Sequence, residues 1–313
     1  MKQTEYRNHA YEIVNEDIAL GQYDGILTVS GDGLIHEAIN GIMNRADKEE
    51  FLKSVGFGCI PAGTANGLHK SITAAFQEEC GILTAAFMCA KGRKCQLDLT
   101  EIDMEYQQNM PNKKVYMFLC MCYAIVADSD INSEFLRFMG DIRFTLYGAY
   151  RIAKLRQYPS KFTFTGKSMD TNIKPHKLTE ADMVANQQID EGFKHLMILN
   201  TAYMGQNIHS APLSRINDGM NDITLVRSTQ ARGKFLKFML VLDGGEYWIK
   251  SKDRKLNGKL DPSLGAEYLK TTEWELKPQS KGPLPAGCNY ENPEGTPTHD
   301  RHIYSIDGEK YPA

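Results

Sequence analysis

Residues 25–43 read GILTVSGDGLIHEAINGIM, and the change of pattern inside them decides the fold of the first part of the chain. Residues 25–29 form a short apolar run, as expected of a strand buried on both faces of a parallel sheet. Gly31 and Gly33 then bracket Asp32 in what reads as a tight turn. Apolar side chains follow at the spacing of an amphipathic helix, at Ile35, Ala38, Ile39, Ile42 and Met43. The stretch therefore predicts a strand, a glycine turn and a helix.

The same succession recurs at residues 57–67, FGCIPAGTANG. A second apolar run enters a glycine-containing turn, and helical segments follow it as far as residue 88. Another helical face precedes the first strand within residues 10–18. Strand, glycine turn and helix, twice in succession, are typical of a doubly wound α/β unit. We expect such a nucleotide-binding domain over residues 1–94.

Strand-like runs dominate the chain from about residue 95 onward. They lie at residues 115–126, 161–165, 195–201, 222–226, 267–276 and 302–306. Their separations favour an antiparallel β-sandwich domain over residues 95–313. Helical segments are expected at 134–157 and 231–242, and loops at the polar residues 167–191 and at residues 278–300, which are rich in Pro, Gly and Asn.

Composition excludes several classes of protein. The 313 residues carry a formal net charge of −3, without the concentrated basic surface that nucleic-acid binding needs. No apolar run approaches the ~18 residues that a membrane-spanning helix requires, and residues 1–13 lack the apolar core of a secretory signal. The seven cysteines form no C-x-x-C pair, which favours reduced thiols over disulfides or a zinc site. We expect a soluble intracellular protein.

The two glycine turns suggest a site for phosphate groups. In an open α/β sheet, ligands bind where a strand ends and a glycine turn opens a helix, and free N–H groups there attract anions. Asp32 repels phosphate, but it can act as a base or help to hold Mg²⁺. The lysine-bearing P-loop and the G-x-G-x-x-G pattern are both absent. A purely structural Asp-Gly turn remains the alternative.

Four separate motifs resemble one family. SGDGLIHEAINGIMNR at 30–45 and PAGTANGLHKSI at 61–72 look like the catalytic core of sphingosine kinases, within the wider diacylglycerol kinase catalytic family. IVADSD at 125–130, followed by GDIRFTL at 140–146, is similar to the segment of that family that carries substrate and nucleotide contacts. IDGE at 306–309 resembles its closing D-G-E motif. The match covers most of the chain in order.

The resemblance implies a role for each matching residue. Asp32 would be the general base that deprotonates the primary hydroxyl of the lipid. The substrate region would be lined by Ser30, Gly31, Asp32 and Gly33, with Asp130 binding the amino-alcohol head. The nucleotide and its Mg²⁺ would be contacted by Thr4, Glu5, Tyr6, Arg7, Asn8, Glu37, Gly63, Thr64, Ala65, Arg137, Arg143, Asp307, Gly308 and Glu309. The implied cofactors are ATP and Mg²⁺.

Each of these residues also has an interpretation that involves no ligand. Arg137 and Arg143 fit solvated helix charges, and Asp128 and Asp130 fit caps of the helix that follows them. Asp307-Gly308 fits a hairpin turn. Only their joint order along the chain favours the functional interpretation.

The chain also departs from the family pattern. The family begins with a strand and a loop of the form N-P-x-G-G-x-G, whereas this sequence begins at the segment that follows them. We therefore expect an N-terminally truncated kinase that lacks the first strand and binds ATP weakly. Ala65 replaces a loop glycine, and Cys120 and Ala124 replace a Ser and a Gly that sphingosine kinases usually carry.

Residues 143–158, RFTLYGAYRIAKLRQY, fit a basic amphipathic helix. Such a helix could gate the entry of the lipid, rest on an anionic membrane or bind calmodulin. The alternative is an ordinary helix that packs one face on the core and exposes the other to solvent. A lipid kinase collects its substrate from a bilayer, so we expect a cytoplasmic, peripherally membrane-associated protein.

These observations lead to one expected function and three rivals. The expected function is ATP-dependent phosphorylation of a sphingoid base, with no nucleic-acid partner. The rivals are a kinase for diacylglycerol or another lipid, a kinase for NAD, and a lipid- or nucleotide-binding protein without turnover.

Overall fold

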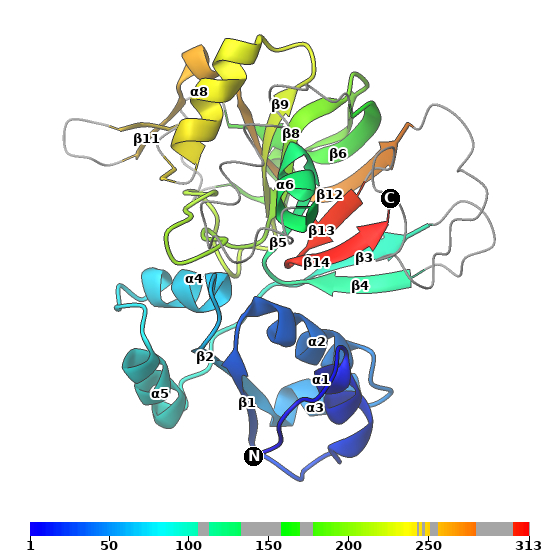
Figure 1. The fold of residues 1–313 in the computed structure, drawn as a ribbon, viewed down its shortest axis with the longest axis vertical. Coiled ribbons are helices and arrows are strands. Elements are labelled where there is room, and N and C mark those ends of the chain that lie inside the picture. Colours follow the sequence, from blue (N-terminus) through cyan, green and yellow to red (C-terminus); the bar gives the residue numbers. More distant parts are fainter. Residues whose placement is uncertain are drawn as a thin grey trace. The chain divides into compact units, whose positions relative to one another are not determined.

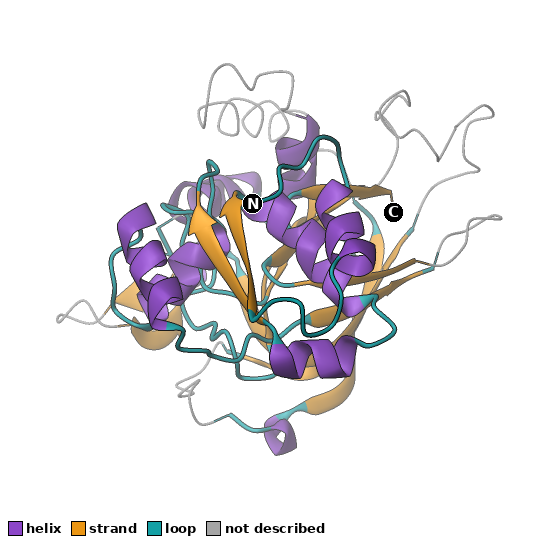
Figure 2. Ribbon diagram, turned by 90° about the horizontal axis from the view of Figure 1, so that it is seen from below, coloured by secondary structure: helices purple, strands orange, loops and turns teal. Residues whose placement is uncertain are grey.

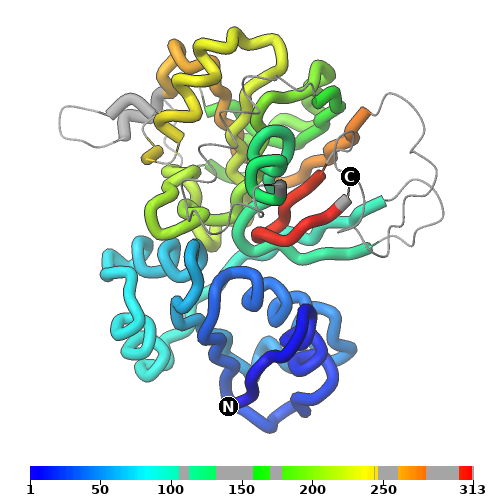
Figure 3. The backbone as a smooth tube through the Cα atoms, in the orientation of Figure 1, coloured from blue at the N-terminus to red at the C-terminus, as the bar shows by residue number. Residues whose placement is uncertain are grey.

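A computed structural model describes residues 1–105, 113–132, 158–169, 178–242, 244–245, 248–250, 256–279 and 303–312. The chain forms two compact units. Unit 1 contains Met1–Leu119, Asn200–His209 and Arg215–Asp218, and unit 2 contains Cys120–Leu199, Ser210–Ser214 and Gly219–Ala313. The path of the chain through each unit can be followed by colour in Figure 3.

Unit 1 is an α/β unit built on two parallel strands, β1 (Gly25–Ser30) and β2 (Gly56–Pro61), whose register pairs Gly25 with Gly56. The antiparallel pair β3 (Thr100–Met104) and β4 (Lys113–Met117) completes its strands. Its helices are α1 (His9–Glu12), the π-helix η1 (Ile13–Asp17), α2 (Asp32–Met43), α3 (Lys48–Ser54), α4 (Gly67–Ala75) and α5 (Ile82–Lys91) (Figure 1).

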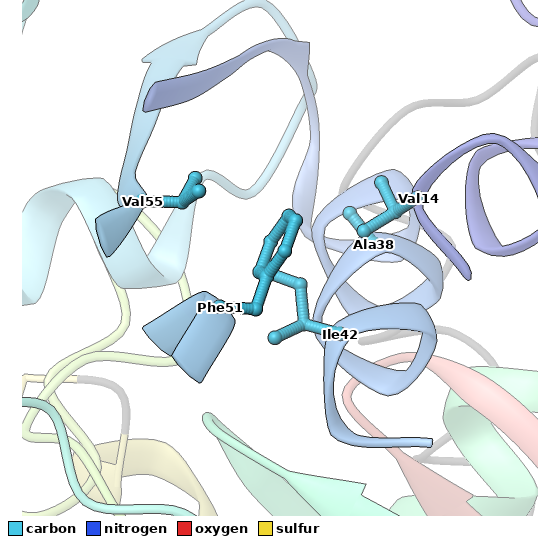
Figure 4. Packing of buried hydrophobic residues seen from close by; sticks show 5 residues of the cluster. All are labelled: Val14, Ala38, Ile42, Phe51 and Val55. Atoms are coloured by element: carbon cyan, nitrogen blue, oxygen red, sulfur yellow. The ribbon is translucent and has the colours of Figure 1, made fainter. Parts of the chain in front are cut away.

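The core of unit 1 lies against the inner face of α2. Ala38 and Ile42 of that helix pack with Val14, Phe51 and Val55, as the close view shows (Figure 4). Phe51 is fully buried, and Ile26 of β1 packs against the same cluster. The helical spacing predicted from the sequence therefore produces a buried apolar face on α2. This face packs against the cluster that Ile26 of β1 also contacts, and Asp32 is the first residue of the helix.

Unit 2 is built on an eight-stranded antiparallel sheet in the order β14-β13-β5-β8-β9-β12-β6-β7. Its strands are β5 (Cys120–Ala124), β6 (Ser160–Ser168), β7 (Val184–Ile189), β8 (Phe193–Leu199), β9 (Asn221–Arg227), β12 (Glu267–Pro278), β13 (Ile303–Ile306) and β14 (Glu309–Pro312). The pair β10 (Trp248–Lys250) and β11 (Leu256–Leu260) forms a separate ribbon.

Helices and short turns complete unit 2. They are α6 (Ile125–Asn132), α8 (Arg232–Leu242) and the 3₁₀ turns η4 (Glu180–Asp182) and η5 (Pro262–Leu264). Every residue of β8 is buried, so its sheet is covered on both faces. Figure 2 distinguishes the helices and strands of both units by colour. An α/β domain followed by an antiparallel β-sandwich domain is therefore confirmed as the fold class.

The structure divides the chain differently from the boundary expected near residue 94. The β3–β4 pair belongs to unit 1, which continues to Leu119. Asn40 of α2 explains why: its Nδ2 donates to the Tyr116 carbonyl at 2.9 Å, and its Oδ1 accepts from the Tyr116 N–H at 2.9 Å. This buried amide fastens β4 to the helix that follows the first glycine turn.

Several expected elements of the second half are confirmed and two are corrected. Strands lie at most of the predicted runs, and α8 matches the helix expected at 231–242. The expected loop at 167–191 was wrong in part, because Val184–Ile189 pairs with β6 as an edge strand. The run at 115–126 is two strands followed by α6. Residues 134–157 and most of 278–300 lie outside the described residues.

No helix in the described part of the chain combines the length and the apolar character that crossing a bilayer requires.

Candidate active site

Asp32 is the first residue of α2, directly after β1, and only 8% of it is exposed. Its Oδ2 accepts a hydrogen bond from the Gly67 N–H at 2.8 Å, and its Oδ1 accepts one from the Leu68 N–H at 3.2 Å. Gly67 and Leu68 are the first two residues of α4, whose N–H groups have no partner inside the helix. The carboxylate therefore lies at the positive end of a neighbouring helix, where charge and hydrogen bonds fix its orientation.

The two glycine turns touch each other. A Cβ built on Gly63 would lie 2.3 Å from the Gly31 Cα, and one built on Gly31 would lie 3.1 Å from the Gly63 Cα. A side chain at residue 63 is excluded unless the backbone moves, whereas one at residue 31 would be a tight contact. The two loops therefore lie together at the ends of the neighbouring strands β1 and β2. Their binding of an anion remains a prediction.

Asn66 closes the second loop and was missed by the sequence analysis. Its Oδ1 accepts from the Gly63 N–H at 2.9 Å, and its Nδ2 donates to the Gly63 carbonyl at 2.6 Å. Its φ of 51° lies in the left-handed region, which Asn tolerates better than most residues. An Asn three residues after a glycine, just before a helix, is a turn signal that could have identified it.

We expect Asn66→Ala to lower the free energy of unfolding by about 2–3 kcal/mol, because it removes two hydrogen bonds and places a plain Cβ in the left-handed region. The matched variant Asn66→Gly removes the same hydrogen bonds without that strain and should cost about 1–2 kcal/mol. Urea denaturation of both variants measures the difference. Equal costs would show that the backbone at residue 66 is not left-handed in solution.

Within the second loop, the residues that precede α4 differ in their exposure to solvent. Thr64 and Ala65 are exposed, whereas Asn66 is 4% exposed beneath them. On the first loop, Ser30 is half-buried and its Oγ donates to the Gly31 carbonyl at 3.0 Å. The predicted ligand-facing residues are therefore accessible on a rigid base.

Glu37 of α2 is hydrogen-bonded to the backbone at Asn8 and Ala10. The Glu37 carboxylate accepts from the Asn8 N–H at 2.8 Å and from the Ala10 N–H at 3.2 Å. The ring of Tyr6 stacks on His9 at 4.4 Å between ring centres, and Tyr6 is 54% exposed. Of the predicted nucleotide-binding residues Thr4, Glu5, Tyr6, Arg7 and Asn8, Asn8 is thus held to α2 at Glu37, five residues beyond Asp32.

A buried thiol lies near Asp32. Burial, and secondly the negative charge of Asp32, raise the pKa of Cys59 to about 12. Cys59 therefore stays a neutral thiol at physiological pH and is no nucleophile.

In unit 2, α6 contains two carboxylates with different surroundings. Asp128 is 1% exposed and accepts a hydrogen bond from the Tyr158 hydroxyl. Asp130 is half-buried, and its Oδ2 accepts from the Ser305 Oγ at 2.5 Å. Both lie inside α6, which begins at Ile125, whereas the helix that they were expected to cap, at 134–157, lies outside the described residues. Asp130 is the one of the two that a ligand can reach.

The D-G-E motif forms a hairpin turn. Ile306 pairs with Glu309, and Asp307 and Gly308 between them have φ of 52° and 86°, as a two-residue hairpin requires. The buried Asp307 carboxylate accepts from the Cys120 N–H at 3.0 Å. The hairpin interpretation is therefore confirmed, and nucleotide contacts of Asp307, Gly308 and Glu309 remain a prediction.

Other predicted residues carry no structural description. Arg137, Arg143 and nearly all of the amphipathic segment at 143–158 lie outside the described residues. Among the residues that are described, no three His, Cys, Asp or Glu side chains gather as a metal site would require.

Comparison with known proteins identifies a domain match and several similar kinases. Residues 1–102 match the diacylglycerol kinase catalytic domain. The chain is 29% identical to sphingosine kinase 1 of Arabidopsis thaliana over 90% of its own length, and 27% identical to sphingoid long chain base kinase 4 of Schizosaccharomyces pombe over 99%. It spans 58% and 63% of the lengths of these two relatives.

The fold is found in a solved structure as well. A diacylglycerol kinase from Bacillus anthracis superposes with a TM-score of 0.54 at 15% identity, covering 99% of this chain and 78% of that chain. At this identity the likeness concerns the fold alone. Sequence and fold agree with the resemblance drawn from the glycine turns and the later motifs. Residues 1–102 therefore match the diacylglycerol kinase catalytic domain, and the chain as a whole is similar to sphingosine kinases.

Proposed function

We propose that the protein is an ATP-dependent lipid kinase that phosphorylates the primary hydroxyl of a sphingoid base to the 1-phosphate. The observation that carries the proposal is the placement of Asp32. Its carboxylate is buried, held by two N–H donors of α4, and next to two glycine turns that touch. The names of the relatives, sphingosine kinase and sphingoid long chain base kinase, support the choice of substrate.

The proposed reaction uses Asp32 as the base. The hydroxyl oxygen of the lipid forms a bond to the γ-phosphorus of ATP, the bond from that phosphorus to the bridging oxygen breaks, and the hydroxyl proton passes to the Asp32 carboxylate. Each carboxylate oxygen accepts one backbone N–H, which fixes the orientation of the group that would receive the proton. Phosphoryl transfer depends mainly on positioning and on neutralising charge, so a fixed carboxylate beside N–H donors suits it.

The unit 1 residues fit a nucleotide and its metal ion. The close approach of Gly31 and Gly63 leaves backbone without side chains, which a phosphate group can approach. Mg²⁺ in such enzymes is held mostly by substrate phosphates with one or two carboxylates, and Asp32 would supply one. When bound, the ion neutralises charge on the phosphate oxygens. Ser30, Gly33, Thr64 and Ala65 would line the same place.

Asp130 would select an amino-alcohol lipid. A carboxylate that a ligand can reach pairs with the ammonium group of a sphingoid base, which diacylglycerol lacks. The hydrogen bond from the Ser305 hydroxyl orients its Oδ2. Cytoplasmic location with reversible membrane association, and calmodulin binding by residues 143–158, are parts of the proposal that rest on the sequence alone.

We expect Asp130→Asn to raise KM for sphingosine roughly ten- to a hundredfold, because a charge-assisted pair is lost. KM for ATP should stay within about threefold. Steady-state kinetics with each substrate varied in turn measures both. Asp128→Asn is the matched control, since Asp128 is buried against Tyr158. An equal rise of both KM values in Asp130→Asn would make Asp130 a structural residue.

The proposed function is tested by offering the purified full chain labelled ATP with sphingosine, diacylglycerol or NAD. Transfer of label to sphingosine is expected. Transfer to diacylglycerol alone would assign the rival lipid substrate, and transfer to NAD alone would assign an NAD kinase. Calorimetric binding of ATP and sphingosine without any transfer would assign a binding protein.

A further inference from the structure

Helix α8 has an inner face that fixes it to unit 2. Phe235 and Phe238 are fully buried, and Leu242 is 4% exposed. The Phe238 ring meets the His195 ring of β8 edge-on at 5.0 Å between centres. The helix is therefore held on the sheet by one side, and its position in Figure 1 is set by these apolar contacts.

The opposite side of α8 is apolar at its centre and basic at its margins. Leu236 is 47% exposed and Leu240 is 75% exposed. Four residues apart, they lie above one another on one helix face. Arg232, Lys234 and Lys237 are exposed on the same helix, and residues 228–242 contain no Asp or Glu. We call Leu236 and Leu240, with Arg232 and Lys237 beside them on the helix surface, the α8 face.

We propose that the α8 face docks on an anionic lipid bilayer. The proposal rests on the proposed function, because a sphingoid base is a membrane lipid that the protein must collect. Apolar side chains flanked by cations match the interface of such a bilayer, where leucine enters the acyl boundary and basic side chains reach the headgroups. The absence of acidic residues over 228–242 makes the charge complementary to anionic lipid.

The size of the α8 face favours a bilayer over a protein partner. A stable protein interface buries about 800 Å² on each side, whereas α8 has only 11 residues and exposes two leucines. A bilayer needs only shallow insertion of about 5–10 Å. Each cation near an anionic surface should raise the partition coefficient about fivefold. Binding should therefore be reversible and sensitive to salt.

The test is flotation of the full chain with vesicles of phosphatidylcholine, with or without phosphatidylserine. Wild type should float with the phosphatidylserine vesicles. Leu236→Glu combined with Leu240→Glu should lower the partition coefficient at least tenfold, as should Arg232→Gln combined with Lys237→Gln. Leu83→Glu is the matched control, because Leu83 is 86% exposed on α5 and should leave binding unchanged. Circular dichroism melting verifies that each variant is folded.

Three outcomes would overturn the proposal. The first is that wild type does not float with the vesicles, and the second is that Leu83→Glu lowers the partition coefficient as much as the α8 variants do. The third is that wild type does not bind vesicles but self-associates, and that the Leu236/Leu240 variant abolishes this self-association. The last would assign the α8 face to a protein interface. A wild-type kinase assay on detergent-dispersed sphingosine separates the two proposals. Activity without flotation overturns only the docking, and flotation without activity overturns only the proposed function.

Discussion

Asp32→Asn should lower kcat for sphingosine phosphorylation by about 10²- to 10⁴-fold, the usual effect of removing a general base. The loss would be larger if the same carboxylate also helps to hold Mg²⁺. The fold should survive, because Asn is about as good as Asp at accepting N–H groups at a helix start. Its amide oxygen can still accept from the Gly67 or Leu68 N–H.

The measurement is a labelled-ATP assay with thermal unfolding as the folding control. Asp32→Ala is the companion variant, since it removes the base and both acceptors together. We expect equal loss of activity in the two variants, with a stability cost of about 1 kcal/mol or more only in Asp32→Ala. Retained turnover in Asp32→Asn within about threefold of wild type would refute Asp32 as the base.

The local pattern of the sequence was sufficient to predict the elements around the first glycine turn. The spacing of Ile35, Ala38 and Ile42 predicts α2, and the core contacts of Ala38 and Ile42 confirm it. The apolar runs of unit 2 predict its strands because both faces of the sheet are covered. Such features depend only on neighbours in sequence, so they are visible in one chain without a structure.

Contacts between distant residues could not be predicted in the same way. The hydrogen bonds from the start of α4 to Asp32 span 35 and 36 positions, and no local pattern encodes them. The edge strand β7 was not predicted because its sequence lacks a continuous apolar run. Its one valine, Val184, is exposed, and two of its residues are glutamines. Exposed and polar side chains are common on edge strands. Helix α3 was missed because Phe51 is its single buried side chain.

The division between units escaped prediction for a similar reason. The apolar run at 115–126 continues across Leu119 and Cys120, where unit 1 ends and unit 2 begins. Composition does not change there. The end of β5 is marked only by Ala124, whose φ of 65° lies in the left-handed region that favours glycine. The resemblance implied a glycine at this position, so the departure at Ala124 carries a backbone cost.

Breaking the ion pair of Lys270 and Asp222 is expected to lower the stability of the fold more than any other change considered. Both side chains are fully buried in unit 2, with 2.8 Å between Nζ and Oδ2. The Tyr268 hydroxyl donates to the other carboxylate oxygen at 2.5 Å. Lys270→Met leaves this buried charge without its cation, which should lower the free energy of unfolding by about 3–5 kcal/mol. Thermal or urea unfolding of the full chain measures it.

A second ion pair on the same strand provides the control. Lys277 lies 2.6 Å from Glu275, and the two side chains are 61% and 55% exposed. Water already solvates both charges there, so Lys277→Met should change stability by no more than about 1 kcal/mol. Adding Asp222→Asn to Lys270→Met should recover part of the loss, because the unpaired charge is then gone. If Lys270→Met costs no more than Lys277→Met, water reaches Asp222 in solution, and burial does not govern this pair.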